Sequence, residues 1–591
     1  MQKQGKQSEI DTNSASPSSV EAKPPSGVLA GAIGKVNGLR VRAMQGASPT
    51  AWALAYADWG AHLALAPSKQ LSLAGSAVTG SVKVAQYAAA STLGLDASPP
   101  VTNDRRFSAP SWQRWPFNVM SQSYLVTEQW LREASTNVPG VSKHHEDMVA
   151  FGFTKVSEAT SPANFLTNPE VIDRTVKERG RNLLRGARHL AQDLKQRVAG
   201  GPIPPIEGFE VGKDVAITPG KVVHRTRLME LIQYAPETPT VHAEPVLIVP
   251  AWIMKYYILD LQPQDSLVKY LVGRGHTVFM ISWKNPTAED RELGMDDYLK
   301  LGVMAALDAI RQIVPGEKIH ATGYCLGGTI LAIAAAAMAR DADDRLKSVT
   351  LFAAQVDFKD AGELTIFIDE HQLASLDESM RERGVLDASQ MVGAFVALRA
   401  GDLQWGRGMR RYLLGEEDSL NDIMAWNADP TRMPYRMHSR YLRQLYLQNE
   451  LADGKYQVGG RPISLSDLHV PFFVVGTEQD HVAPWRSVYK IHRLVRGDVT
   501  FVLTSGGHNA GIVSEPGHRG RRFRTKLTRA TDTYTDPDAF IKTTAPADGS
   551  WWVTWEAWLA QQSRGDTAPP RIGAQGYDAL CDAPGTYVMA R

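Results

Sequence analysis

A single cysteine lies between glycines in a pattern suited to nucleophilic chemistry. The segment Gly323-Tyr324-Cys325-Leu326-Gly327-Gly328 follows a short apolar run, 318–322, and precedes a run of small apolar residues, 329–338. This order predicts a strand, a sharp turn with Cys325 at its apex, and a helix. Glycines are needed around the apex because the turn is strained and the helix passes close to the strand. We therefore expect an exposed nucleophilic sulfur; a buried structural cysteine is the alternative.

A nucleophile in such a turn also needs donors for the negative charge that develops on an attacked carbonyl oxygen. The backbone N–H of Leu326, at the start of the predicted helix, would point toward that oxygen. The second donor is expected from the loop at 249–253, where either Ile253 or Trp252 could supply it.

A strand, a nucleophile turn and a helix in this order are typical of an α/β-hydrolase, here with cysteine in place of serine. In that fold the nucleophile is followed along the chain by an acid and then by a histidine, each after a late core strand. Asp480 follows the run at 471–475, and His508 follows the run at 499–503. His508 would accept the Cys325 proton, and Asp480 would hold its imidazole in the right tautomer.

Other titratable residues offer alternatives. Asp357 follows the strand after the nucleophile turn and is the alternative acid, although a loop carboxylate often only caps a turn. His481, beside Asp480, could line the site. We expect the remaining candidate histidines to be surface or hydrogen-bonded polar residues; they are His438, His469 and His518.

The elements that must position these residues alternate between short apolar runs and helical segments. Such runs are typical of parallel strands that are buried on both faces. They span 245–249, 277–282, 318–322, 348–353, 471–475 and 499–503. Residues 361–451 are too long for a simple connection and are predicted to form a helical cap insertion that controls access to Cys325.

The segments before the sheet have a different character. Residues 1–27 are polar and are predicted to form a disordered tail, followed by an α-helical N-terminal domain, 28–207, and by the catalytic domain, 208–591. Helices are expected over 118–134 and 170–198, the second after the start signal Asn168-Pro169-Glu170, and residues 211–231 mark the entry to the sheet. The Ala- and Leu-rich segment 28–95 is predicted to form loosely packed helices whose apolar faces join the core or, alternatively, bind an apolar surface.

Composition excludes several classes of function. The 591 residues include 64 basic and 63 acidic side chains, so the balance lacks the basic excess of a nucleic-acid-binding protein. The two cysteines, Cys325 and Cys581, suggest neither a disulfide framework nor a zinc site, which favours a reducing, cytoplasmic location. We expect no metal, no membrane span and no secretory signal.

A cysteine nucleophile favours acyl transfer, because a thiolate exchanges one thioester for another at little energetic cost. This chemistry suits transfer from coenzyme A, with hydrolysis as the competitor unless a closed cap excludes water. A terminal cluster of tryptophans, which could bind a polymer, is predicted instead to pack in the core; it comprises Trp551, Trp552, Trp555 and Trp558.

With these motifs in hand, the chain resembles the polyhydroxyalkanoate synthases, most closely the class I, short-chain type, from about residue 104 to its end. The cysteine-containing box at 323–328 matches the lipase-like box of that family. Further similar motifs occur in order along the chain at 161–171, 218–223, 256–261, 282–286, 426–427, 438–443, 507–508 and 549–552.

The resemblance implies that (R)-3-hydroxyacyl-CoA, such as 3-hydroxybutyryl-CoA, is polymerised into polyester with release of CoA and without a cofactor. It implies Cys325 as the acylated nucleophile, His508 as its base and Asp480 as the third member, with Asp260 and His481 as supporting residues. It also implies a homodimer on the surface of cytoplasmic polymer granules, together with granule-associated proteins. Two other functions stay open: a polyester depolymerase or thioesterase with the same fold, and a non-catalytic granule protein, against which the intact Cys325, Asp480 and His508 argue.

Overall fold

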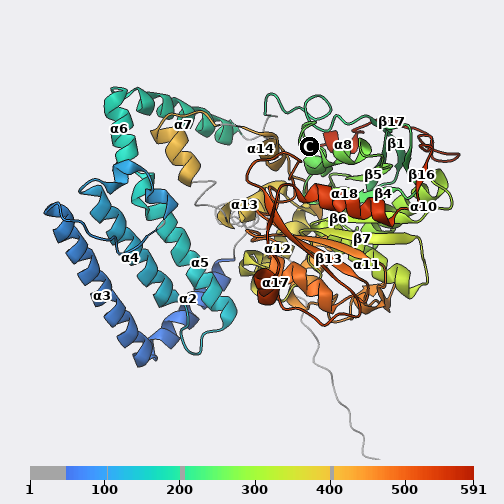
Figure 1. The fold of residues 1–591 in the computed structure, drawn as a ribbon. Helices are drawn as coiled ribbons and strands as arrows, with labels where there is room; N and C mark the ends of the chain where they lie inside the picture. The colour runs from blue at the N-terminus through green and yellow to red at the C-terminus, as the bar shows by residue number, and fades with distance from the viewer. Residues whose placement is uncertain (1–47, 103, 200–205, 399–404, 419) are drawn as a thin grey trace, which may run out of the picture. The chain divides into compact units, whose positions relative to one another are not determined.

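The computed structural model describes residues 48–591 except 103, 200–205, 399–404 and 419. The predicted disordered tail, 1–27, and the first part of the predicted N-terminal helices, 28–47, lie outside the described residues. The described chain begins with helices and continues into a large sheet (Figure 1).

Helices make up the described chain before the sheet. They are α2 (Pro49–Ala64), α3 (Pro67–Thr92), α4 (Phe117–Ser135), α5 (Lys143–Thr160), α6 (Pro169–Lys177) and α7 (Arg181–Ala199), drawn from blue to teal in Figure 1. The helix expected over 118–134 is confirmed as α4. The single helix expected over 170–198 is wrong, because Arg179 and Gly180 adopt left-handed backbone angles, with φ of 52° and 81°, and separate α6 from α7.

The first two helices bury their apolar residues to different extents. Ala51 and Ala55 of α2 are buried. Along α3, however, Leu71, Val78 and Val82 are 74%, 64% and 49% exposed, and their spacing places them on one helical face. The prediction that the apolar faces of this segment join the core therefore holds only in part.

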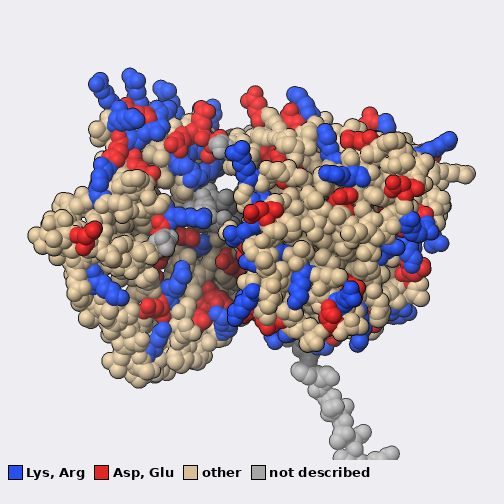
Figure 2. Space-filling view, in the orientation of Figure 1, with Lys and Arg blue, Asp and Glu red and all other residues tan. Residues whose placement is uncertain are grey.

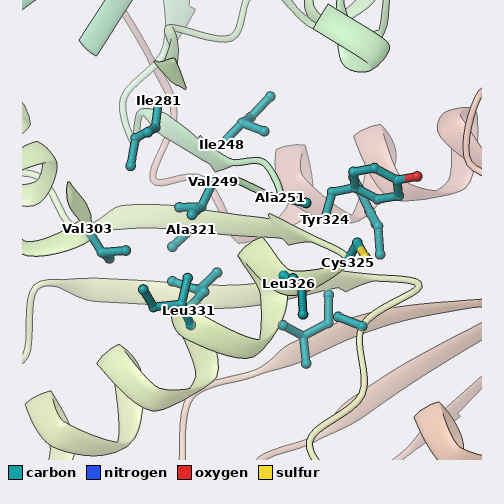
Figure 3. Close-up of a cluster of buried hydrophobic side chains, with 14 of the residues drawn as sticks. Ile248, Val249, Ala251, Ile281, Val303, Ala321, Tyr324, Cys325, Leu326 and Leu331 are labelled. Carbon is teal, nitrogen blue, oxygen red and sulfur yellow. The ribbon is translucent and has the colours of Figure 1, made fainter. Parts of the chain in front are cut away.

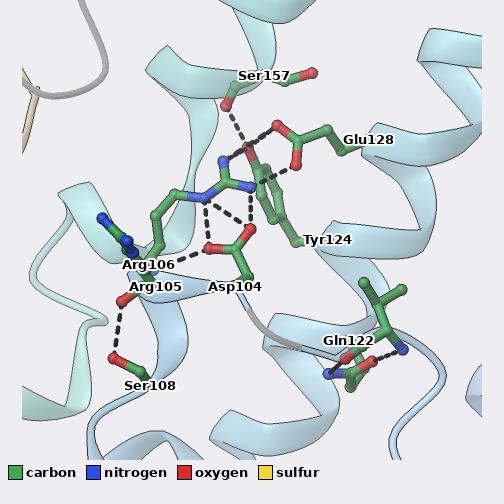
Figure 4. Close-up of polar contacts among 9 residues, drawn as sticks. Asp104, Arg105, Arg106, Ser108, Gln122, Tyr124, Glu128 and Ser157 are labelled. Atoms are coloured by element: carbon green, nitrogen blue, oxygen red, sulfur yellow. Dashed lines mark hydrogen bonds and ion pairs between the residues drawn. The ribbon is translucent and has the colours of Figure 1, made fainter. Parts of the chain in front are cut away.

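An ion cluster fixes the irregular segment before α4 (Figure 4). The guanidinium of Arg106 lies between the carboxylates of Asp104 and Glu128, at 2.7 and 2.5 Å. The Tyr124 hydroxyl donates to the Ser157 carbonyl at 2.7 Å and so joins α4 to α5. Charged and hydrogen-bonded side chains thus connect three successive segments of this helical region.

The sheet has eleven strands in the order β15-β14-β13-β12-β7-β6-β4-β5-β2-β1-β17. Its six parallel strands are the ones that the apolar runs predict: β4 (Val246–Val249), β5 (Val278–Trp283), β6 (Ile319–Tyr324), β7 (Leu346–Phe352), β12 (Phe472–Thr477) and β13 (Val499–Thr504). Antiparallel strands complete both sides: β1 (Gly220–Arg225), β2 (Met229–Tyr234) and β17 (Cys581–Asp582) on one, β14 (Arg522–Thr528) and β15 (Ala547–Asp548) on the other.

Two helices on the sheet matter for the site. Helix α11 (Leu326–Arg340) follows Cys325 directly and is buried from Leu326 to Met338. Helix α18 (Trp551–Gln562) buries Trp551, Trp552 and Trp555, which confirms the core prediction for these three tryptophans; the rings of Trp551 and Trp555 contact that of Phe352 in β7.

The cap insertion, 361–451, consists mainly of helices. They are α12 (Glu370–Arg383), α13 (Ala388–Leu398), α14 (Asp422–Asn427) and α15 (Tyr435–Tyr441), with wider π-helical turns at Met409–Leu413 and Leu442–Leu447. A short ribbon pairs β8 (Val385–Leu386) with β9 (Met433–Pro434).

The surface view shows basic and acidic side chains interspersed over the sheet region on the face drawn (Figure 2). Among the described residues, no helix is both long enough and apolar enough to span a membrane.

Candidate active site

The predicted nucleophile turn is present at the carboxyl end of β6 (Figure 3). Cys325 has φ 53° and ψ −124°, a strained conformation for a residue with a side chain, and its N–H donates to the Phe352 carbonyl at 2.9 Å. A Cβ on Gly323 would lie 2.3 Å from the Gly328 Cα, and one on Gly327 would lie 2.0 Å from the Val249 carbonyl oxygen. The glycines are thus required by close backbone approach, as the motif predicts.

The sulfur is less accessible than the sequence predicts. Cys325 is only 8% exposed, so the expectation of an exposed sulfur is wrong with respect to bulk solvent. The reason is the cap insertion, whose residues, including Phe367, Leu386 and Tyr441, line a cavity together with Cys325. The nucleophile faces this cavity instead of the open surface.

Asp480 and His508 form the pair that the strand order predicts. His508 Nδ1 lies 2.8 Å from Asp480 Oδ2, and the Asp480 side chain has no solvent exposure. The other carboxylate oxygen accepts the N–H groups of Val482 and Ala483 at 2.9 and 2.8 Å. Burial acts to raise the pKa of Asp480, but the attraction and hydrogen bond of His508, with these N–H groups, lower it below its ordinary value.

The electrostatics of His508 favour its protonated form. Burial lowers the pKa of its imidazole, but the charges of Asp480 and Cys325, together with hydrogen bonds to both, raise that pKa well above the ordinary value. A histidine stabilised by the charge of a thiolate on one side and a carboxylate on the other can hold the proton that the thiol gives up.

The alternative acid, Asp357, lies in other contacts. Its Oδ1 accepts from the Lys359 N–H at 2.9 Å and lies 3.3 Å from Lys490 Nζ. It thus caps a turn and forms an ion pair, whereas the Nδ1 of His508 is occupied by Asp480.

The loop that carries His508 is held by contacts that the sequence does not reveal. The Tyr324 hydroxyl donates to Asn509 Oδ1 at 2.7 Å, and its ring lies 5.6 Å from that of His508. The indole N–H groups of Trp551 and Trp552 donate to the carbonyls at positions 511 and 512, at 3.0 and 2.9 Å. Only the fold brings α18 against this loop, so neither anchor has a local sequence signal.

Both main candidates for oxyanion donors line the same cavity as Cys325. Leu326 is the first residue of α11, where an N–H has no partner within the helix. Ile253 lines the cavity, while its carbonyl accepts from the Thr431 N–H at 3.3 Å. Trp252 is buried, and its ring lies 5.5 Å from that of Tyr298.

Asp260 and His481, the supporting residues that the family resemblance implies, are outside the lining of the cavity. The carboxylate of Asp260 is buried and accepts from the hydroxyls of Thr218 and Ser266 at 2.5 and 2.7 Å, and burial raises its pKa. His481 adjoins Asp480, and its carbonyl accepts from the Glu363 N–H at 3.2 Å. The side chains that line the cavity do not include either residue.

The cavity has a volume of about 130 Å³ and a mostly apolar wall. Three polar atoms in its lining residues are buried without a hydrogen-bond partner among the described residues: Gln355 Oε1, Gln390 Nε2 and His438 Nδ1. His438 is only 3% exposed, so the expectation that it is a surface residue is wrong, and its Nδ1 is not hydrogen-bonded to any described residue. The burial of His438 depends on how α15, which is part of the cap insertion, packs against its neighbours, and burial lowers its pKa to about 4.

Matches to known proteins cover most of the chain. The model of the poly-beta-hydroxybutyrate polymerase (PhaC) N-terminus matches residues 103–271, and a second N-terminal model of this polymerase matches residues 36–69. The alpha/beta hydrolase fold model matches residues 244–515. The poly(3-hydroxyalkanoate) polymerase of Methylorubrum extorquens is 41% identical over 83% of this chain and 82% of its own length. The chain belongs to the poly(3-hydroxyalkanoate) polymerase family.

Other members of this polymerase family match over similar lengths. The polymerase subunit of Rhizobium etli is 39% identical over 84% of this chain and 78% of its own length, and that of Cupriavidus necator is 36% identical over 84% of each. Among solved structures, a monoacylglycerol lipase from Paleococcus ferrophilus matches 57% of this chain and 99% of its own, with 12% identity and a TM-score of 0.31.

Proposed function

We propose that the chain is an acyltransferase that polymerises short-chain (R)-3-hydroxyacyl-CoA through a covalent intermediate on Cys325. Its membership in the poly(3-hydroxyalkanoate) polymerase family supports polymerisation. The observation that carries the mechanism is the His508–Asp480 pair, 2.8 Å apart, beside a cysteine that is buried in a mostly apolar cavity.

The geometry supports acylation of Cys325 as the first half-reaction. His508 takes the proton of the Cys325 thiol, and the thiolate attacks the thioester carbonyl of the substrate. The N–H groups of Leu326 and Ile253 stabilise the negative oxygen of the tetrahedral intermediate. The carbon–sulfur bond to CoA then breaks, the CoA thiolate takes the proton from His508, and the acyl group stays on Cys325. Asp480 holds the imidazole and stabilises its charged form throughout. CoA is a leaving group, and no cofactor takes part.

Ester formation uses the same residues in a second half-reaction. The hydroxyl of a growing chain or of a second hydroxyacyl unit attacks the acyl carbonyl on Cys325. Its proton passes to His508, an ester bond forms, and the thiolate of Cys325 leaves and recovers the proton. Water would give a free hydroxy acid in the same step. The low exposure of Cys325 under the cap insertion disfavours that competing reaction.

The size and polarity of the cavity favour a small hydroxyacyl group. A cavity of about 150 Å³ holds a benzene-sized molecule, so about 130 Å³ suits an acyl group of a few carbons. The unpartnered atoms His438 Nδ1 and Gln355 Oε1 can hydrogen-bond the hydroxyl of the substrate, which a plain apolar pocket would leave unsatisfied.

Two alternatives compete with this function. A polyester depolymerase or acyl-CoA thioesterase could use the same three residues, and a non-catalytic granule protein could retain the fold. The intact Cys325, Asp480 and His508 favour an enzyme over a structural protein.

The deciding experiment measures CoA release from 3-hydroxybutyryl-CoA and analyses the acyl product by mass spectrometry, with Cys325→Ala as control. We expect CoA release with insoluble polyester, abolished by the substitution. CoA release with free hydroxy acid alone would replace polymerisation by thioesterase activity. Unchanged release by the Cys325→Ala variant would remove this cysteine from the mechanism.

We also propose that the chain acts as a homodimer in the cytoplasm, at the surface of polymer granules and alongside granule-associated proteins. The exposed apolar residues of α3, Leu71, Val78 and Val82, support contact with a hydrophobic polyester. Co-sedimentation with polyester particles should weaken in Leu71→Gln/Val78→Thr/Val82→Thr but not in the control Leu527→Gln/Val553→Thr, whose residues are also exposed, by 49% and 47%. Equal binding by both variants would exclude α3 as the contact, and sedimentation velocity would show whether the chain dimerises.

A further inference from the structure

Two histidines and a glutamate converge at a place remote from the cavity of Cys325. The ligand atoms of His242, His276 and Glu556 all lie within 4.8 Å of one another, and among the described residues no other group of three or more potential metal ligands is this close. They come from the end of β3 (Val241–His242), from the turn before β5, and from α18. Because the three residues are far apart in the sequence, no metal-binding motif predicts that they lie together.

The backbone fixes both histidines before any ligand is present. The His242 N–H donates to the Gly275 carbonyl at 2.8 Å, which places His242 next to the residue that precedes His276. Strand β3 pairs with β16 (Asp566–Thr567), so that Asp566 lies directly opposite His242. The two imidazole rings lie 4.6 Å apart, centre to centre. An arrangement held by strand pairing and backbone hydrogen bonds is preorganised for coordination.

The burial and the unpartnered ring nitrogens of His276 are not explained by a simple ion pair with Glu556. Its side chain is 1% exposed, and neither ring nitrogen has a hydrogen-bond partner among the described residues. The carboxylate of Glu556 lies 3.5 Å from its Nε2. A buried imidazole whose two ring nitrogens are both unpartnered can offer a nitrogen to a cation.

Two distances between donor atoms at this place are close to those around a small divalent cation. Tetrahedral zinc with bonds of about 2.0–2.1 Å holds neighbouring ligand atoms about 3.3 Å apart. The pairs His276 Nε2–Glu556 Oε1 and His242 Nδ1–Asp566 Oδ1 lie at 3.5 and 3.3 Å. Two imidazoles with carboxylate oxygens are a donor set that zinc prefers over magnesium or calcium.

We propose that His242, His276 and Glu556 form a structural zinc site, next to the Asp566 carboxylate that pairs with His242. The site lies at the opposite end of the sheet from the nucleophile: His276 precedes β5, Cys325 follows β6, and both strands run parallel to β4. The ion thus takes no part in the acyl-transfer step. It ties α18 and β16 to the start of the parallel strands, and α18 in turn carries the tryptophans that anchor the His508 loop. This inference does not rest on the proposed function.

The test uses the full chain without a polyhistidine tag, loaded with zinc chloride, dialysed, and analysed for metal by mass spectrometry. We expect about one zinc ion per chain in the wild type and its loss in both His276→Gln and Glu556→Gln. The matched control is His492→Gln, because His492 also has a ring nitrogen without a partner but lies outside the cluster, and it should retain zinc. The measurement is repeated in a Cys325→Ala background, so that zinc bound by the reactive thiol is not counted.

A second measurement compares the wild type with and without zinc, so its main result does not depend on the folding of a variant. Removal of zinc by a chelator should lower the Tm of the wild type by a few degrees, and zinc should restore it, because a ligand that binds only the folded state stabilises it. Glu556→Gln should show neither change. Zinc at background level in the wild type with no response of Tm, or zinc retained in both cluster variants, would overturn the proposal.

Discussion

Asp480 Oδ2 and His508 Nδ1 lie 2.8 Å apart although 28 residues separate them in the chain. The two residues follow adjacent parallel strands, β12 and β13, whose carboxyl ends lie at the same edge of the sheet. Because Cys325 follows β6 at that edge, strand order alone brings the three residues together. The charge of the carboxylate then sets the protonation of the histidine.

Replacing that charge while keeping its shape should slow acyl transfer strongly. We expect Asp480→Asn to lower kcat for CoA release by about 10²–10⁴-fold, since the amide neither stabilises the imidazolium nor fixes its tautomer. KM should change little. The control is Asp357→Asn, which removes a carboxylate bound to Lys490 and should leave kcat within a few fold. A comparable loss in the control would move the acid from Asp480 to Asp357.

The raised pKa of His508 predicts how stability depends on pH. A group whose pKa is higher in the folded state stabilises that state fully below its unfolded pKa of about 6.5, and this contribution disappears as pH rises through the folded value. The Tm difference between wild type and His508→Gln should therefore shrink as the pH rises above 6 into the alkaline range. In a Cys325→Ala background the loss should begin at lower pH, because Cys325 contributes to the raised pKa. A difference that grows with pH would contradict this assignment.

His438 should bind substrate at a cost to stability. Its Nδ1 is buried without a partner, so His438→Leu should raise KM for 3-hydroxybutyryl-CoA about tenfold while the free energy of unfolding stays equal or increases. His438→Gln keeps a polar group and should lie between the two. Steady-state kinetics and urea unfolding on the same preparations check both parts. A purely structural role would instead reduce stability and leave KM unchanged.

What the sequence predicts depends on how local its signal is. The six parallel strands are buried on both faces and therefore appear as continuous apolar runs. The glycines of the nucleophile turn are required by close contacts within the turn and with the backbone next to it. Strand β14 escapes notice because most of its residues are polar and exposed or half-buried, and β17, at the edge of the sheet, has only two residues. The burial of Cys325 and His438 depends on how the cap insertion folds over the sheet. The local sequence around each residue therefore does not predict its burial.

The break between α6 and α7 is another feature that the local sequence does not predict. Residues 170–198 keep one amphipathic pattern, yet the chain leaves the helix at Arg179 and Gly180. Gly180 offers the left-handed conformation at low cost, but whether a helix uses it depends on tertiary contacts. Here Gly186 in α7 approaches the Tyr412 carbonyl of the cap insertion so closely that a Cβ would lie 1.9 Å from it. That contact has no counterpart in the local sequence.

The glycines of the nucleophile turn allow a direct test of how the fold positions Cys325. In Gly327→Ala the new Cβ would lie 2.0 Å from the Val249 carbonyl oxygen, a backbone atom that cannot move aside without shifting β4. We expect the free energy of unfolding to fall by about 1–3 kcal/mol. CoA release should be nearly abolished, because Cys325 and the Leu326 N–H would shift together. The control is Gly60→Ala in α2, where the added Cβ meets nothing within 4 Å and alanine should stabilise by about 0.5–1 kcal/mol. If Gly327→Ala folded as stably as wild type and kept its activity, the close packing of α11 on β4 would not be what positions the nucleophile.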